Sequence, residues 1–172
     1  MKKIAIIIGS ASDLSQCDKG LKFLGTVPKS EVEVTGVFIR SQHRNTISTQ
    51  NLLEKLSKEE TDVIIVGAGW ANHLTGCCDA YLRYELQNDH TVVVGVAFED
   101  PKNQKHTDAA ILSITEVPGT QVVFSDENSQ FVGRQGFFDA CVTATWGNLP
   151  KIEVPAPKPI MDLSLQEALE KL

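Results

Sequence analysis

The sequence predicts an α/β fold in which a doubly wound parallel sheet carries helices on both faces, giving three layers. Near-continuous β-branched runs at Ile4–Ile8, Asp62–Val66 and Thr91–Phe98 are typical of parallel strands that are covered on both sides. Amphipathic helical patterns separate these runs, so strand and helix alternate from the first residues to about Trp146. This alternation indicates βαβ units with right-handed crossovers.

Two further segments are weaker strand candidates. Glu31–Ile39 alternates polar and apolar residues more than the other strands do, which favours a place nearer the edge of the sheet. Gln121–Phe124 is a short fifth candidate. Ligands of open α/β sheets gather beyond the carboxyl ends of the strands, so we expect the functional residues in the loops that follow them.

The first predicted helix follows the first strand, and Ser12 or Asp13 would cap it. Gly25 suits its carboxyl end, because glycine commonly terminates helices. One side of this helix would carry the apolar residues Leu14, Cys17, Leu21 and Leu24.

Four more helices are predicted from the 3.6-residue spacing of apolar residues. They span Ser48–Leu56, Leu74–Leu86, Asp108–Ile114 and Gly133–Thr145. In the first of these, the residues at helical spacing are Leu52, Leu53 and Leu56. In the last, the expected buried stripe is Phe137, Phe138, Cys141 and Val142.

The chain of 172 residues, with 42% hydrophobic residues, is expected to form one α/β catalytic domain over residues 1–149. Lys151–Ile160 contains three prolines and should be an extended arm. A short helix is expected to begin near Asp162 or Ser164. We expect this terminal segment, residues 150–172, to pack on a neighbouring subunit.

Charge and composition exclude several classes of partner. The formal net charge is −6 and no cluster of lysine and arginine occurs, which argues against nucleic acid. The longest apolar runs have the length of a strand, far short of a membrane span, so no membrane partner is expected. The four cysteines show no metal-ligand or CxxC spacing, which favours reduced thiols and a cytoplasmic location.

Three loops at consecutive strand ends carry unusual polar residues: Gly9–Asp13, Ser41–Asn45 and Gly67–Gly76. A glycine followed by a helix start suits a phosphate group, and Arg44 offers a rigid guanidinium fork for the same group. The histidines His43 and His73 suit proton transfer near neutral pH. Each loop alone also fits a plain structural role, as a capped turn, a solvated loop or a tight turn. Their occurrence at successive strand ends favours one shared site.

At these loops the sequence resembles the family of N5-carboxyaminoimidazole ribonucleotide mutases and aminoimidazole ribonucleotide carboxylases of purine biosynthesis. The family pattern GSxSD, SAHR and GAGGAAHLPG stands here as GSASD, SQHR and GAGWANHLTG, in the same order. A fourth family segment is echoed by Asp108–Gly119, and the resemblance runs from about Lys3 to Thr145. It implies a flavodoxin-like α/β fold, a homo-octamer with sites at subunit contacts, and no metal or organic cofactor.

The resemblance also implies roles for individual residues. His43 corresponds to the proton-transfer histidine, and His73 would lie with Leu74 near the substrate carboxylate. The ribose phosphate and sugar hydroxyls would be held by the loop residues Gly9, Ser10, Ser12, Asp13, Ser41 and Arg44. Ala68 and Gly69 would line the base pocket. The implied partner is a phosphorylated aminoimidazole ribonucleotide.

The sequence departs from the family pattern in and around these loops. Gln42 and Asn72 replace alanines, Trp70 replaces a glycine, and Thr75 replaces a proline. The segment Glu99–Thr107 is polar and charged where the family has small residues, and Asp139 stands where the family usually has asparagine. Trp70 adds a bulky ring to a loop that normally lies against the ligand. The HLTG ending is closer to the mutase pattern than to that of direct carboxylases.

The leading hypothesis is therefore a mutase that moves a carboxylate from the exocyclic amine to ring carbon 4, with His43 as acid and base. Within enzymes, the alternative is a direct carboxylase that combines aminoimidazole ribonucleotide with free carbon dioxide. A second alternative is a ribonucleotide-binding relative without catalytic activity. A flavodoxin-like electron carrier shares the order of elements, but it would be yellow, and we expect a colourless protein.

Overall fold

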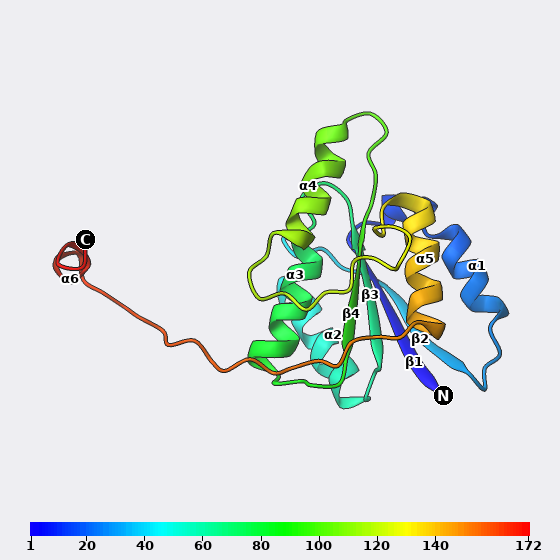
Figure 1. The fold of residues 1–172 in the computed structure, drawn as a ribbon, viewed down its shortest axis with the longest axis horizontal. Helices are drawn as coiled ribbons and strands as arrows, with labels where there is room; N and C mark the ends of the chain where they lie inside the picture. The colour runs from blue at the N-terminus through cyan, green and yellow to red at the C-terminus, as the bar shows by residue number, and fades with distance from the viewer.

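A computed structural model describes residues 1–172 and contains a four-stranded, all-parallel sheet (Figure 1). The strands are β1 (Lys2–Ile8), β2 (Val32–Ile39), β3 (Val63–Ala68) and β4 (Val92–Ala97), arranged in the order β2-β1-β3-β4. The chain therefore moves to one side of β1 to form β2 and then crosses back to form β3. This is a doubly wound sheet, and the predicted α/β fold is confirmed.

Helices cover both faces of the sheet, as the sequence predicts. The five helices of the body are α1 (Asp18–Thr26), α2 (Thr46–Lys58), α3 (His73–Ala80), α4 (Gln104–Thr115) and α5 (Gly133–Trp146). One hydrophobic cluster joins the sheet to α1 and α5, and a second joins it to α2 and α3, while α4 packs beside β4 (Figure 1). No helix is both long and apolar enough to cross a bilayer.

The alternation of side chains along β1 explains why its sequence is continuously apolar. Ile4, Ile6 and Ile8 point into the cluster beneath α1 and α5, whereas Ala5 and Ile7 point into the cluster beneath α2 and α3. All five residues are fully buried. Because each buried isoleucine side chain contributes about 1.5–3 kcal/mol, this strand anchors both halves of the core.

The two weaker strand candidates have different outcomes. β2 lies at an edge of the sheet, as its alternating pattern predicts, and Val34 and Val37 are exposed there. The prediction of a fifth strand at Gln121–Phe124 is wrong, because that segment makes only an isolated bridge between Val123 and Val94. The pairing stops there because the next outward-facing donor of β4, Ala97 N, bonds to Phe131 O, after Gly95 N has bonded to Val123 O.

The first predicted helix is divided in two. Residues Ala11–Gln16 form a 3₁₀ helix, η1, and α1 begins only at Asp18. Ser10, rather than Ser12 or Asp13, caps η1 through a hydrogen bond from Ser12 N to its hydroxyl. The break interrupts the 3.6-residue period, so Leu14 is exposed while Cys17 is fully buried. Gly25 lies inside α1, which ends at Thr26.

The remaining helices are confirmed with changed boundaries or faces. The predicted helix Leu74–Leu86 is α3 followed by a π-helical turn, η2 (Tyr81–Glu85), which is built around the buried guanidinium of Arg83. Arg83 Nε donates to Asp79 Oδ1 at 3.1 Å, and its other nitrogens donate to backbone carbonyls of Asn88 and Thr91. In α5 the small residues Ala140 and Ala144 complete the buried face, whereas Phe138 and Val142 are only half-buried.

The terminal segment leaves the body, as Figure 1 shows. Ile152 is still buried, and Glu153 exchanges two backbone-to-side-chain hydrogen bonds with Gln121, so the chain is tied to the body up to Glu153. Beyond that point it is extended until α6 (Leu165–Leu169), where Ser164 and Glu167 form a capping box. The short helix predicted near Asp162 or Ser164 is confirmed.

Two glycines of α1 provide a matched test of the packing between α1 and α5. A methyl group at Gly20 would lie 2.6 Å from the Phe137 ring and 2.7 Å from Cys141 Sγ, whereas one at Gly25 would meet nothing within 4 Å. We expect Gly20→Ala to lower the free energy of unfolding by about 1–3 kcal/mol through overpacking. Gly25→Ala should raise it by up to about 1 kcal/mol through helix propensity. Urea unfolding measures both, and shifts of the same sign would contradict the packing described.

Candidate active site

The loops that follow β1, β2 and β3 line one cavity of about 590 Å³. Its size is typical of small-molecule sites, and it lies at the carboxyl ends of the strands, where the sheet changes its winding direction. The cavity brings together every site residue singled out from the sequence: Gly9, Ser10, Ser12, Asp13, Ser41, His43, Arg44, Ala68, Gly69, His73 and Leu74. Gln42, Trp70 and Ala71 line it as well.

The floor of the cavity depends on a close approach between the loops after β1 and β3. Gly9 N donates to Gly67 O at 2.8 Å, and a side chain at Gly9 would place its Cβ 2.7 Å from the Cβ of Ala68. Only glycine fits this contact without displacing the neighbouring backbone. The same contact fixes the separation between these two loops, both of which line the cavity.

The loop after β1 presents hydroxyl groups and one carboxyl group. Ser10 Oγ lies 2.8 Å from Ser12 Oγ, and Ser12 Oγ donates to Asp13 Oδ1 at 3.4 Å. Burial raises the pKa of the Asp13 carboxyl above its usual value, and hydrogen bonds from Ser12 and from the backbone of Gly69 and Ser10 oppose this effect. The loop therefore offers donors and an acceptor suited to sugar hydroxyls and phosphate oxygens.

His43 and His73 meet within the cavity, although thirty residues separate them in the sequence. His43 Nε2 lies 3.0 Å from His73 Nδ1, and the two rings are nearly perpendicular at a centroid distance of 5.1 Å. In a hydrogen bond between two ring nitrogens, one must carry a proton and the other must lack one. The two imidazoles therefore share one proton in this hydrogen bond. Such a pair is suited to acid–base chemistry on a bound ligand.

A buried hydrogen-bond set positions His73, the first residue of α3. Asn72 is fully buried and caps the helix, since its Oδ1 accepts from Thr75 N and from Thr75 Oγ1 at 3.2 and 3.0 Å. Asn72 Nδ2 donates to Val96 O at 3.0 Å, which ties the helix start to β4. His73 therefore does not cap α3 itself. Asparagine is one of the residue types preferred at helix N-caps, so Asn72 is the sequence signal that marks the start of α3.

Arg44 is exposed at the cavity wall next to His43. The arginines that form ion pairs are Arg83, with Asp79, and Arg134, with Asp18, so the Arg44 guanidinium faces no internal carboxylate. Asn45 holds the turn that carries Arg44, because its Oδ1 accepts from Ser41 N at 3.2 Å and its N donates to Ser41 O at 2.8 Å. A free guanidinium beside serine hydroxyls is suited to a phosphate group.

Comparison with known proteins shows the family of the chain and a solved structure with a similar fold. The family model described as AIR carboxylase matches residues 3–126. The chain belongs to the AIR carboxylase family. Among solved structures, PurE of Treponema denticola is similar at 17% identity and a TM-score of 0.53, over 83% of this chain and 89% of that one. A search of curated protein sequences found no match.

Enzymes of the AIR carboxylase family are carboxylases and mutases that act in purine biosynthesis, on aminoimidazole ribonucleotides. Two departures of this member from the family pattern, Asn72 and Thr75, are now explained, because they bond to each other in the buried cap. No three histidine, cysteine or acidic side chains are grouped as a metal site. All four cysteines are free. Desolvation raises the pKa of each thiol above its usual value, including that of Cys77, which is only partly shielded from solvent.

Replacement of Asn72 tests how His73 is held. We expect Asn72→Ala to lower the free energy of unfolding by about 1–3 kcal/mol, because it leaves Thr75 N buried without its partner and removes the bond to Val96 O. Asn51→Ala, at an exposed position of α2, is the matched control and should change it by less than about 0.5 kcal/mol. Chemical unfolding measures both variants, and equal losses would contradict the buried cap.

Proposed function

We propose that the protein is an N5-carboxyaminoimidazole ribonucleotide mutase, which transfers the carboxylate from the exocyclic amine of its substrate to ring carbon 4. The observation that carries the proposal is the 3.0 Å contact between His43 and His73 inside a cavity rich in hydroxyl and guanidinium donors. The HLTG ending at His73–Gly76 favours a mutase over a direct carboxylase, since it is closer to the mutase pattern.

The proposed binding mode divides the substrate among the three loops. Ser10, Ser12 and Asp13 hold the ribose phosphate and sugar hydroxyls, while Ser41 and Arg44 supply further phosphate donors. Gly9, Ala68 and Gly69 let the backbone approach the ligand closely, and Leu74 closes the pocket. This mode leaves the histidine pair beside the reacting groups, where His43 exchanges protons with the substrate.

The proposed chemistry needs one proton to be given and one to be taken back. Protonation of the exocyclic nitrogen breaks its bond to the carboxylate carbon and releases carbon dioxide and aminoimidazole ribonucleotide within the pocket. Carbon 4 of the ring then attacks the carbon dioxide, and the proton that carbon 4 carried leaves to the base. His43, in contact with His73, serves as acid and then as base, so the pair ends in its starting state.

Confinement of carbon dioxide supplies much of the proposed rate. Holding two reacting groups in contact can lower a barrier by about 7–11 kcal/mol relative to reaction between free molecules. Within the wall segment Ala68–Ala71, only Trp70 has a large side chain, so the backbone there lies close to the proposed site of reaction. A pocket that retains carbon dioxide would favour the mutase reaction over exchange with dissolved gas.

Two cavity variants separate catalysis from binding. We expect His43→Asn to bind aminoimidazole ribonucleotide normally and to lose about 10²–10⁴-fold in turnover of the N5-carboxylated substrate, because it removes the acid and base. Arg44→Ala should weaken ribonucleotide affinity by about 10- to 150-fold through loss of a charge-assisted phosphate contact. Calorimetry and a substrate assay measure the two effects, and Arg134→Ala, on the surface of α5, is the control for a lost arginine.

The wild-type assay supplies both substrates separately, in the absence of an ATP-dependent partner enzyme. Turnover of the N5-carboxylated substrate alone supports the mutase. Turnover of aminoimidazole ribonucleotide with carbon dioxide alone would replace it with the direct carboxylase. Ribonucleotide binding without turnover of either would establish a binding protein, and near-normal turnover by His43→Asn would remove His43 from the chemistry.

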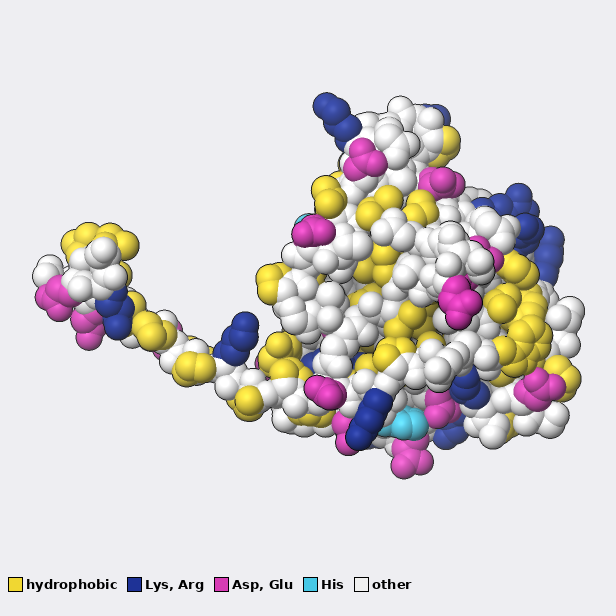
Figure 2. Space-filling model, viewed as in Figure 1, with side chains coloured by type: hydrophobic (Ala, Val, Ile, Leu, Met, Phe, Trp, Pro, Cys, Tyr) yellow, Lys and Arg dark blue, Asp and Glu magenta, His cyan; other side chains and the backbone are white.

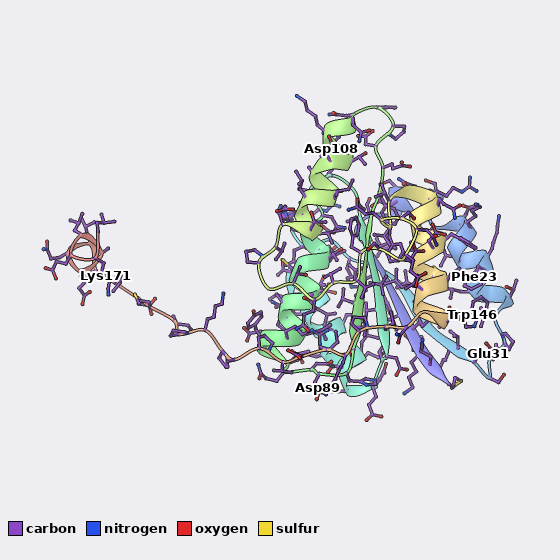
Figure 3. All side chains as sticks on the ribbon, viewed as in Figure 1. Phe23, Glu31, Asp89, Asp108, Trp146 and Lys171 are labelled. Carbon is purple, nitrogen blue, oxygen red and sulfur yellow. The ribbon has the colours of Figure 1, made fainter.

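We further propose that the terminal segment packs on a neighbouring subunit in a homo-octamer. Its apolar side chains are exposed on the single chain, as Figure 2 shows, and Lys171 marks how far α6 lies from the body in Figure 3. They include Ile160, Met161, Leu163, Leu165, Leu169 and Leu172. Because contiguous exposed apolar residues commonly mark an interface, we propose that the body of a second copy covers them.

Removal of residues 155–172 tests this assembly, because the cut lies beyond the contacts of Ile152 and Glu153 with the body. Light scattering of the full chain should give the mass of eight subunits, and the shortened chain should give a smaller assembly. Leu165→Asp in the full chain is the matched control that keeps the segment but disrupts its apolar face. An unchanged mass in both variants, or a monomeric full chain, would contradict the proposed docking.

A further inference from the structure

Trp70 brings a large aromatic surface to a cavity lined, apart from Leu74, by small and polar side chains. Of the residues that line the cavity, it is the one tryptophan, and no phenylalanine or tyrosine accompanies it. One face of its ring is stacked on His106, with ring centroids 4.0 Å apart and planes inclined by 19°. The residue is still 63% exposed, so the opposite face of the indole remains open.

His106 is held rigidly as the base of this stack. It lies in the first turn of α4, and its Nδ1 is 2.7 Å from Asp100 Oδ2. Its Nε2 is 3.0 Å from Asn103 Nδ2, while Asn103 Oδ1 accepts from Lys105 N. The imidazole is therefore fixed at both nitrogens. Both Glu99–Thr107 and Trp70 depart from the family pattern. The first of these supports the second, because His106 lies in it and stacks on the Trp70 ring.

The backbone at Trp70 is strained, which indicates that the side chain makes contacts that offset the cost of this conformation. Its φ of +57° lies in the left-handed region, where a non-glycine residue costs about 1–2 kcal/mol. The family pattern has glycine at this position, which adopts that conformation readily. Glu60 and Gln87 also have positive φ, but neither lines the cavity. The stack on His106 offsets part of this conformational cost. A ligand in contact with the open face of the indole offsets more of it.

We propose that Trp70 determines specificity by stacking its open face on the planar heterocycle of the ligand, and that His106 is a positioning residue behind it. The inference rests on the proposed function for the identity of that ring, a substituted imidazole. The hydroxyl and guanidinium donors of the cavity suit the phosphate and the sugar, which leaves the ring as the part that an aromatic surface recognises. Offset-stacked aromatic rings attract each other beyond the area that they bury.

The test compares two ligands that differ by the ring: aminoimidazole ribonucleotide and ribose 5-phosphate. By calorimetry, Trp70→Gly should weaken binding of the ribonucleotide by about 5- to 15-fold and leave ribose 5-phosphate within about twofold of the wild type. Trp70→Phe should restore most of the lost affinity. Trp146→Phe, at the far end of α5 in Figure 3, is the matched control and should bind both ligands normally.

Two further measurements separate a stacking surface from a structural role. In the Trp146→Phe background Trp70 is the sole tryptophan, and the ribonucleotide, but not ribose 5-phosphate, should quench its fluorescence. His106→Ala should weaken ribonucleotide binding by about 2- to 5-fold, and His106→Phe should restore it. Equal losses for both ligands in Trp70→Gly, or no loss for either, would overturn the proposal. Failure of the wild type to bind either ligand would instead overturn the proposed function on which it rests.

Discussion

The order β2-β1-β3 is the constraint on which the rest of the structure depends. Because β1 is central and all strands are parallel, the loops that follow three successive strands leave the same edge of the sheet side by side. The contact between Gly9 and Ala68 fixes two of these loops, and the buried cap of Asn72 fixes the start of α3. The loops after β2 and β3, on either side of β1, thereby bring two imidazoles thirty residues apart in the sequence to within 3.0 Å.

The polar chemistry of the cavity is therefore supported by apolar packing. β1 places alternate side chains in the two hydrophobic clusters, so its carboxyl end is held from both faces. The histidine pair, the hydroxyl groups and Arg44 are all exposed or half-buried, so a molecule in the cavity can reach them. The cavity thus combines a rigid, packed scaffold with accessible side chains on loops. This arrangement is typical of binding sites in folded proteins.

Much of this could be predicted from the sequence, and the failures have physical causes. The buried strands and the cavity loops follow from long β-branched runs and from motifs at strand ends. The strand predicted at Gln121–Phe124 is absent because three consecutive apolar residues do not reveal whether a partner edge continues beside them. The stack of Trp70 on His106 joins two loop regions whose meeting depends on tertiary structure. Periodicity does not report such contacts.

The loops after β1, β2 and β3 line one cavity, and we propose that they bind a single ligand together. Backbone amide NMR during titration with aminoimidazole ribonucleotide tests this, because each loop contributes its own signals. Amides of residues 9–13, 41–44 and 67–74 should shift together along one binding curve, while those at the opposite ends of the strands should stay unchanged. Shifts confined to a single loop, or separate curves for different loops, would contradict a shared site.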